Sequence, residues 1–294
     1  MMLIACATDH HYAELAGVML ASLAKNGDSA GSEVVLFGAG LNNRDKKWLR
    51  ESAGQSIKVI FFDLDGQRLA ALRRLRTTRY ITAVAYVRML MPDLLNDRTG
   101  RLLYLDCDVV VNHSLAFLRE FDLKGLPLAA VRSSIAPDKL AAINAGIGRQ
   151  ADAPYFNSGV LLFDIDEWRR RDLGPRCMDY AANRKGPIHF HDQDVLNHVV
   201  GGDWAAIPGT WNRGVKGLSL EECEATAVLH FKGKRKPFHS DFVWPAKQIY
   251  DRHRAATPWA ARRPVSALRR SLRMRWKTLK GRIRGTVSAS AGEE

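Results

Sequence analysis

The amino-acid sequence predicts an α/β fold with a mainly parallel central sheet. Two observations support this prediction: short apolar runs alternate with helical patterns, and acidic residues stand just past the ends of two of these runs. The chain has 294 residues, of which 46% are hydrophobic and 26% charged, as in an ordinary soluble globular protein. These values exclude a disordered chain, a fibre and a small disulfide-stapled protein.

The first half of the chain alternates between expected strands and helices. The expected strands are Leu3–Ala7, Val34–Phe37 and Ile57–Phe62. Between them lie a helix that contains Trp48 and Leu49 and a helix whose apolar face is formed by Leu15, Val18, Met19 and Leu23. Such alternation is typical of parallel sheets covered on both faces, whose active sites lie beyond the carboxyl ends of the strands. Asp9 and Asp106 stand at such ends.

The second half is less regular. The elements expected there are a strand at Arg101–Leu105, a strand at Tyr155–Phe163, one helix at Asp166–Ala182 with Asp166 as its N-cap, a short helix at Val195–Val200, and a buried strand at Ala227–Phe231. The last of these strands delivers His230 to its end.

The net charge of +13 is concentrated at one end of the chain. Residues 252–294 hold twelve Lys and Arg against only Glu293 and Glu294, a net charge of +10, which leaves +3 for residues 1–251. Prolines also break the pattern at Pro258 and Pro264. We therefore divide the chain into a main domain at 1–250 and a basic tail at 251–294.

Within this tail, apolar residues recur every three or four positions, which predicts an amphipathic helix. They are Val265, Leu268, Leu272, Trp276, Leu279 and Ile283. An apolar stripe with a Trp among cations fits a helix at an anionic membrane surface, where each cation contributes about 1 kcal/mol. The alternative is a helix docked on the main domain. Nucleic acid is not an expected partner, because the stripe is apolar and no recognition fold is visible.

The cysteines indicate a reducing compartment. Cys6, Cys107, Cys177 and Cys223 are widely spaced and form no CxxC pair, as in cytosolic proteins with reduced thiols. The segment from Met1 to Ala7 lacks a basic start and is interpreted as a strand rather than a signal peptide. With no apolar run of about 18 residues, we expect a cytoplasmic protein, peripherally associated with the inner face of the membrane.

The strongest chemical signal is Asp106-Cys107-Asp108 at the exit of an apolar strand. Two carboxylates in apolar surroundings call for a cation, and alternation of the backbone puts both side chains on one face. A divalent ion that also holds phosphate oxygens would suit this pair. The alternative interpretation is a pair of Asp residues that cap a loop, but the apolar flanks on both sides disfavour it.

Three further segments interrupt apolar runs with polar residues. Asn157-Ser158-Gly159 indicates backbone brought close to a ligand, with a β-bulge as the alternative. His189 and His191 alternate like metal ligands before Asp192, Gln193 and Asp194, although Asp194 could simply cap the following helix. The run from His230 to Lys236 could clamp phosphate, or form a basic surface turn.

These four segments, in this order, resemble glycosyltransferase family 8 over about residues 2–245. The resemblance is carried by Y-L-D-x-D, Y-F-N-x-G-V-L, D-Q-D-x-L-N and H-x-x-G-x-x-K-P. It implies a GT-A-type fold with a Rossmann-like nucleotide-sugar domain, a UDP-sugar donor, bound Mn²⁺ or Mg²⁺, and retention of anomeric configuration.

The resemblance also implies roles for single residues. Asp106, Asp108 and His230 match the metal ligands, with Cys107 between the two aspartates. The uridine segment corresponds to Ala7, Asp9, His11 and Tyr12, of which Asp9 would accept from the uracil and Tyr12 would stack on the ring. Arg88 matches the arginine near the donor sugar and diphosphate, and the phosphate clamp corresponds to Gly233 and Lys236.

At the donor sugar, the resemblance places Asn157 and Ser158 along the ring, Asp192 on its hydroxyls and Gln193 at its reactive face. Because an amide is a poor nucleophile, we expect Gln193 to stabilise an oxocarbenium-like ion pair rather than form a covalent bond. The sequence departs from the family pattern at Cys107, at Phe238 and at 131–134, where an acidic residue is missing. These departures leave the acceptor and the donor sugar open.

The sequence thus predicts a metal-dependent, retaining hexosyltransferase. It would move galactose or glucose from UDP-galactose or UDP-glucose to a glycan or glycolipid such as lipopolysaccharide core. One alternative is a metal-dependent phosphohydrolase that uses Asp106, Asp108, His189 and His191. The other is a non-catalytic scaffold that binds carbohydrate or membrane.

Overall fold

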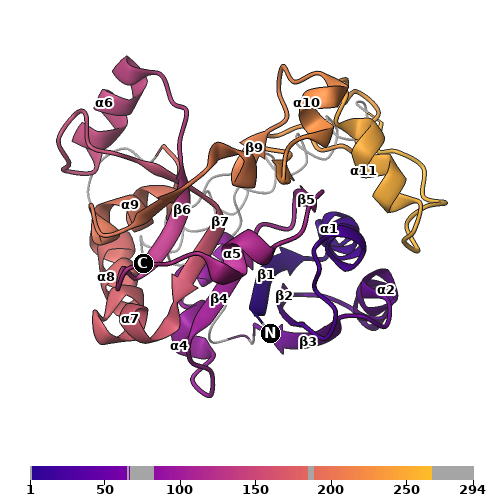
Figure 1. Ribbon diagram of the computed structural model, residues 1–294, viewed down its shortest axis with the longest axis horizontal. Coiled ribbons are helices and arrows are strands. Elements are labelled where there is room, and N and C mark those ends of the chain that lie inside the picture. The colour runs from indigo at the N-terminus through magenta and orange to yellow at the C-terminus, as the bar shows by residue number, and fades with distance from the viewer. Residues whose placement is uncertain (1, 65, 67–82, 185–188, 267–294) are drawn as a thin grey trace, which may run out of the picture.

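The computed structural model describes residues 2–64, 66, 83–184 and 189–266. Its centre is a seven-stranded sheet in the order β3-β2-β1-β4-β7-β6-β8 (Figure 1). The strands are β1 (Leu3–Asp9), β2 (Glu33–Ala39), β3 (Lys58–Asp63), β4 (Arg101–Leu105), β6 (Leu128–Arg132), β7 (Phe156–Asp164) and β8 (Ala205–Ile207). All neighbouring pairs are parallel except those of β7, which runs antiparallel to both β4 and β6. The mainly parallel sheet is confirmed.

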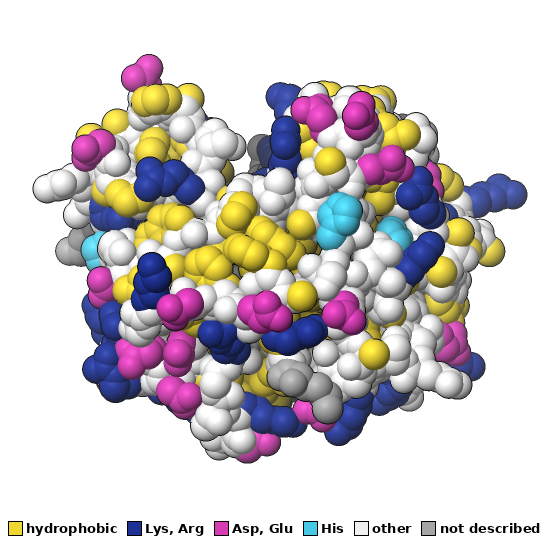
Figure 2. All heavy atoms as spheres, in the orientation of Figure 1, with side chains coloured by type: hydrophobic (Ala, Val, Ile, Leu, Met, Phe, Trp, Pro, Cys, Tyr) yellow, Lys and Arg dark blue, Asp and Glu magenta, His cyan; other side chains and the backbone are white. Residues whose placement is uncertain are grey.

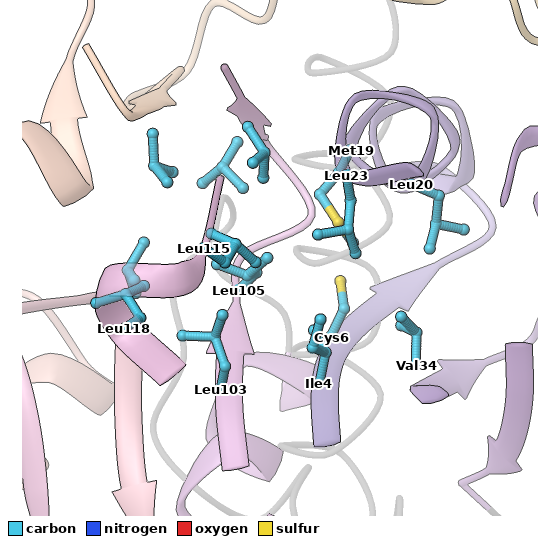
Figure 3. Close-up of a cluster of buried hydrophobic side chains, with 14 of the residues drawn as sticks. Ile4, Cys6, Met19, Leu20, Leu23, Val34, Leu103, Leu105, Leu115 and Leu118 are labelled. Atoms are coloured by element: carbon cyan, nitrogen blue, oxygen red, sulfur yellow. The ribbon is translucent and has the colours of Figure 1, made fainter. Parts of the chain in front are cut away.

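Alternating side chains of the strands feed two hydrophobic layers, one on each face of the sheet. Ile4 and Cys6 of β1 belong to the layer under α1 (Ala13–Asn26), α2 (Asn43–Ala53) and α5 (Ala116–Glu120), which Figure 3 shows in close-up. Ala5 and Ala7 face the opposite layer, which is covered by η1 (Ala83–Met89), α4 (Met91–Leu94), α7 (Ile165–Arg170), α8 (Leu173–Asn183) and α9 (Asp192–Val200). Both faces are covered, as the near-continuous apolar strands require.

A second sheet of three short strands extends the carboxyl edge of the first. It consists of β5 (Val109–Val111), β10 (Val228–His230) and β9 (Arg213–Gly214), with η2 (Gly209–Asn212) leading into β9. β10 pairs antiparallel with β5, which places His230 opposite Val109. The residues before β5 and the end of β10 are therefore neighbours, although they are more than 100 positions apart in the chain.

The helix expected at Asp166–Ala182 is wrong in one respect, because the structure has two helices there. α7 ends before Asp172, whose φ of 56° is left-handed, and α8 begins immediately after it. The N-cap of α7 is Asp164, which accepts from the backbone N–H of Glu167, rather than Asp166. A residue with left-handed φ cannot continue a right-handed helix, so the helix ends there. The periodicity of apolar residues continues on both sides of Asp172 and therefore does not reveal the break.

The remaining helices are α6 (Pro137–Gly146), α10 (Leu220–Glu224) and α11 (Lys247–Arg254). The division expected at residue 250 falls inside α11, and the chain stays packed on the sheet domain after it. Trp259 is 2% exposed and meets Trp48 edge-on at 5.2 Å. Val265, expected on a helical stripe, instead pairs in extended conformation with His239. The rest of the stripe lies outside the described residues.

Within the described ranges, no helix is both long and apolar enough to cross a membrane.

Candidate active site

An open cleft lies at the carboxyl ends of β1 and β4, where the sequence directed attention. Its volume is about 240 Å³. Because β7 runs antiparallel, its first residues lie at the same edge and also face the cleft. The lining residues are Ala7, Thr8, Asp9, Tyr12, Val84, Ala85, Arg88, Tyr104, Asp106, Cys107, Asp108, Asn157, Ser158, Phe190, Asp192, Gln193 and Lys236.

Asp106, Asp108 and His230 converge beside this cleft. One ligand atom from each lies within 4.8 Å of the others, and they form the candidate metal group among the described residues. The Nε2 atom of His230 is 3.6 Å from Asp106 Oδ2 and 3.3 Å from Asp108 Oδ1. Two carboxylates and an imidazole are ligands that Mn²⁺ and Mg²⁺ sites accept, so the donor set fits a divalent cation.

The backbone of β7 approaches His230 at Gly159. A Cβ atom at this position would lie 2.3 Å from Cε1 and 2.6 Å from Nδ1 of the His230 ring, and 2.9 Å from Asp106 Oδ2. No side chain fits there without displacing the ring. Gly159 thus lies close to two side chains of the protein, His230 and Asp106. The register of β7 against β6 also shifts at this segment, in agreement with the β-bulge that was the alternative expectation.

Two buried cations balance the carboxylates of the candidate metal group. The Lys236 ammonium donates to Asp108 Oδ2 and to the carbonyl of Phe231, the latter at 2.8 Å. Arg88 lies 3.0 Å from Asp106 Oδ1, which also accepts from the Tyr104 hydroxyl at 2.6 Å. Burial by itself would raise the pKa of Asp108, but the adjacent Lys236 ammonium holds this pKa well below its usual value.

Arg88 also joins the metal group to Asp192. Its Nε atom is 3.1 Å from Asp192 Oδ2, and its Nη1 atom donates to the carbonyl of Ser158 at 2.7 Å. The Ser158 hydroxyl donates to the same carboxylate at 3.1 Å. Burial, together with the charge of Asp106, raises the pKa of Asp192 despite the opposing effect of Arg88. The Arg88 guanidinium thus pairs with the carboxylates of both Asp106 and Asp192.

Gln193 and Asn157 lie next to each other, although they come from α9 and β7. Asn157 Nδ2 donates to Gln193 Oε1 at 2.7 Å, and the backbone N–H of Ser158 donates to the same oxygen at 3.2 Å. The amide oxygen of Gln193 is therefore held against β7. Asp194, considered as a helix cap, instead accepts from the backbone N–H groups of His189 and Phe190 and from the Tyr155 hydroxyl.

The expected uridine segment is only partly in the cleft. Ala7, Asp9 and Tyr12 line it, whereas His11 is exposed and is not among the lining residues. Asp9 Oδ1 accepts from the backbone N–H groups of His11 and Tyr12 at 2.9 and 3.1 Å, which fixes the turn into α1. Gly233 is exposed, has a φ of 90° and also lies outside the lining set.

Cys107 reaches the hydrophobic layer as well as the cleft, and burial raises the pKa of its thiol well above the usual value. It is not part of the candidate metal group.

Two polar residues of the site carry no role in the sequence analysis. Tyr104 could have been found there, because it stands two positions before Asp106 in a strand and therefore shares its face. Asn212 accepts from His230 Nδ1 with its Oδ1 atom at 2.7 Å, and its Nδ2 atom donates to Asn157 Oδ1 at 2.7 Å. Nothing in the local sequence around Asn212 signals this position.

The sequence model described as Glycosyl transferase family 8 matches residues 3–241. The chain belongs to glycosyltransferase family 8. It is 24% identical over 278 residues to General stress protein A of Bacillus subtilis (strain 168), which covers 88% of this chain and 94% of that protein. It is also 24% identical over 276 residues to lipopolysaccharide 1,2-glucosyltransferase of Escherichia coli (strain K12), covering 90% and 80% of the two chains.

Among solved structures, galactosyltransferase LgtC in complex with donor and acceptor sugar analogues has the same fold. The TM-score is 0.73 at 23% sequence identity, over 87% of this chain and 96% of that one. The family resemblance and the fold expected from the four motifs are thus confirmed, and this family 8 protein is a transferase.

Proposed function

We propose that this family 8 protein transfers galactose or glucose from UDP-galactose or UDP-glucose to a glycan or glycolipid, with retention of configuration. The convergence of Asp106, Asp108 and His230 at the cleft carries this proposal. Two kinds of relative support the class of substrate: the glucosyltransferase of E. coli is named for lipopolysaccharide, and LgtC was solved with donor and acceptor sugar analogues. Lipopolysaccharide core is accordingly the acceptor that we favour.

In this proposal, Asp106, Asp108 and His230 hold Mn²⁺ or Mg²⁺. The bound ion would supply Lewis-acid stabilisation of the charge that develops on the diphosphate leaving group. Lys236 lies beside Asp108 and is placed to contact the phosphates, with Gly233 in the turn before it. The donor set fits this use, because both carboxylates lie beside a cationic side chain, Lys236 for Asp108 and Arg88 for Asp106.

The other lining residues then bind and orient the donor. Asp9 and Tyr12 hold the uracil at the end of β1, beside Ala7 and with His11 in the adjoining turn. Arg88 contacts the sugar and diphosphate while it holds Asp192 for the sugar hydroxyls. Ser158 and Asn157 lie along the ring and Gln193 at its reactive face, where we expect it to stabilise positive charge without a covalent bond.

The phosphohydrolase alternative is not favoured by the site. It requires His189 and His191 beside Asp106 and Asp108, but the group that forms within the described part of the chain contains His230 instead. The scaffold alternative is disfavoured as well, because every expected metal ligand is present and converges with the others.

The first test is a panel of UDP-sugars screened for thermal shift and for Mn²⁺-dependent hydrolysis. A donor that binds only the folded chain raises its melting temperature. We expect UDP-galactose or UDP-glucose to do so, and Asp108→Ala to abolish metal-dependent turnover because it removes one of three ligands. Release of inorganic phosphate without sugar transfer would contradict the proposal, as would unchanged turnover by Asp108→Ala.

We further propose that the basic segment 252–284 attaches the enzyme to the anionic inner face of the cytoplasmic membrane, where a lipid-linked acceptor is available. Support comes from the cation-rich amphipathic pattern of the sequence.

A further inference from the structure

Asn212 connects the candidate metal group with the residues placed at the donor sugar, which come from separate motifs of the sequence. It lies at the end of η2, is 2% exposed, and reaches both His230 and Asn157 with its side-chain amide. Parallel pairing of β9 with β10 sets it beside His230, and Trp211 anchors η2 by stacking on Phe117 at 5.2 Å. A hydrogen-bonded chain thus runs from His230 through Asn212 and Asn157 to Gln193.

The backbone of β7 sets the direction of each hydrogen bond in the series from His230 to Gln193. The N–H of Gly159 donates to Asn157 Oδ1 at 3.1 Å, and the N–H of Ser158 donates to Gln193 Oε1 at 3.2 Å. A backbone N–H can only donate, so each facing atom must be an amide oxygen. The orientation of both amides, which is otherwise ambiguous, is therefore determined.

The orientation of the Asn157 amide in turn fixes that of Asn212 and the tautomer of His230. Because Asn157 Oδ1 is an acceptor, the Asn212 atom that faces it must be the NH₂ group. The Oδ1 atom of Asn212 is then left to face Nδ1 of His230 at 2.7 Å, and this oxygen can only accept. Nδ1 of His230 must carry the proton, so that in the neutral ring Nε2 has a free lone pair.

This lone pair points at two carboxylate oxygens. Nε2 lies 3.6 Å from Asp106 Oδ2 and 3.3 Å from Asp108 Oδ1, so three electron-pair donors meet with no proton between them. Such an arrangement is stable when a cation sits among the donors. We propose that Asn212 is a positioning residue, which holds His230 in the Nδ1–H tautomer and so prepares Nε2 to bind a divalent cation together with Asp106 and Asp108. The inference rests on the proposed function for the part that the cation plays in sugar transfer. Its first measurement, the tautomer of His230, needs no substrate.

Two substitutions separate the interaction of Asn212 with His230 from its interaction with Asn157. Asn212→Ala removes the acceptor for His230 and the donor for Asn157. Asn212→Asp keeps an acceptor for His230 Nδ1 but places a second acceptor against Asn157 Oδ1. Asn212→Ala should disturb the His230 tautomer and metal binding. Asn212→Asp should disturb only Asn157 and Gln193, the residues placed at the donor sugar.

The test combines long-range ¹H–¹⁵N spectra of the histidine side chains with Mn²⁺ binding followed by electron paramagnetic resonance. The spectra are recorded on the full chain without metal at mildly alkaline pH, and His230→Gln assigns the His230 signals. We expect the wild type to carry its proton on Nδ1. In Asn212→Ala the proton should move to Nε2, the form that histidine prefers in water, and Mn²⁺ affinity should fall about 10- to 100-fold.

Asn212→Asp should keep the Nδ1–H signal and Mn²⁺ affinity close to those of the wild type, with a lower kcat for donor hydrolysis. Asn144→Ala is the matched control. Asn144 is fully buried and donates to the carbonyls of Ala151 and Ala153 at 3.1 and 2.9 Å, so its loss tests general destabilisation. We expect this control to lower the melting temperature and to leave the His230 tautomer unchanged.

A wild-type His230 with its proton on Nε2 would overturn the proposal. So would an Asn212→Ala variant that keeps the wild-type tautomer or the wild-type Mn²⁺ affinity. If Asn212→Ala does not fold, the same spectra of Asn212→Asp decide the matter, because loss of the Nδ1–H signal there contradicts the role. Failure of the transferase proposal would appear separately, as normal tautomer and metal results without sugar transfer.

Discussion

Single atoms decide the geometry of the candidate metal group. The ring of His230 occupies the space that any side chain at position 159 would need, since a Cβ atom there would lie 2.3 Å from Cε1 of the ring. The ring is also buried and hydrogen-bonded to Asn212, so it has little room to move aside. The Gly at position 159 therefore serves the ligand set directly, as well as the sheet.

We predict that Gly159→Ala weakens Mn²⁺ binding by about tenfold or more, because the new methyl group displaces a metal ligand. Calorimetric titration of Mn²⁺ measures the change. Gly202→Ala is the matched control, since no atom lies within 4 Å of the position of its new Cβ and its φ is not left-handed. Equal Mn²⁺ affinity of the two variants would show that His230 tolerates the intrusion.

At the scale of elements, two buried features hold α1 against the end of α11 and the segment that follows it. Trp259 lies directly against Gly17 of α1, where an added Cβ would come within 2.3 Å of the indole ring. Glu14 of α1 is 3% exposed and is paired with Arg254 at 2.8 Å and with Arg262 at 3.2 Å. The segment after residue 250 therefore supplies both core volume and the countercharges of a buried carboxylate.

Gly17→Ala should destabilise the protein by about 1–3 kcal/mol, because the methyl group overpacks the contact with Trp259. The sign is informative: in an open helical position the same change stabilises by roughly 1 kcal/mol. Urea unfolding followed by tryptophan fluorescence gives the free energy of unfolding. An increase in stability would mean that Trp259 does not pack on α1.

His253 of α11 makes the packing of α11 against α1 dependent on pH. Burial, together with the charges of Lys25 and Arg252, lowers its pKa to about 4, and its Nε2 atom lies 3.4 Å from Asn26 Nδ2. The unfolded chain binds this proton near pH 6.5, whereas the folded protein resists it. The stability contributed by neutral His253 is therefore complete above about pH 6.5 and is lost as the pH falls towards 4.

We expect the wild type to lose about 2 kcal/mol more stability than His253→Gln between about pH 7 and pH 4. Urea unfolding at both pH values measures the difference between the two proteins. A loss of equal size in both would show that other groups account for the acid sensitivity.

At the scale of the whole molecule, charge separates the described body from the end of the chain. Residues 1–251 carry only +3, and Figure 2 shows acidic and basic side chains interspersed over one face of the body. The excess of +10 lies in residues 252–294, of which the structure describes those up to 266. Arg254 and Arg262 already serve Glu14, so the cations after residue 266 are the ones to test for membrane binding.

A chain that ends at residue 266 should keep donor hydrolysis and lose binding to vesicles that contain anionic phospholipid, whereas the full chain should co-sediment with them. Ending the chain at residue 250 is a poor test, because it strips Trp259, Arg254 and Arg262 from α1 and leaves Glu14 buried without these partners. Neutral vesicles serve as the control for charge. Equal sedimentation of the full chain and the chain ending at 266 would contradict the membrane proposal.

Much of the fold could be predicted from short stretches of sequence. The strands β1, β2, β3, β4 and β7 were expected within one or two residues, because buried strands are contiguous apolar runs. The break between α7 and α8 was not expected, since the apolar pattern continues through Asp172. The antiparallel direction of β7 was also missed, because direction depends on which strands become neighbours and leaves no mark on local composition.

The sequence by itself determined the family and the two carboxylates of the candidate metal group, because their motifs are contiguous and each residue type has its own chemistry. The tertiary structure decided what surrounds them. Asn212, Gly159 and His230 meet only because β7 and β10 bring distant parts of the chain together, and their hydrogen bonds take their direction from backbone N–H groups of β7. Contacts of this kind depend on strand pairing and direction, which local sequence does not encode.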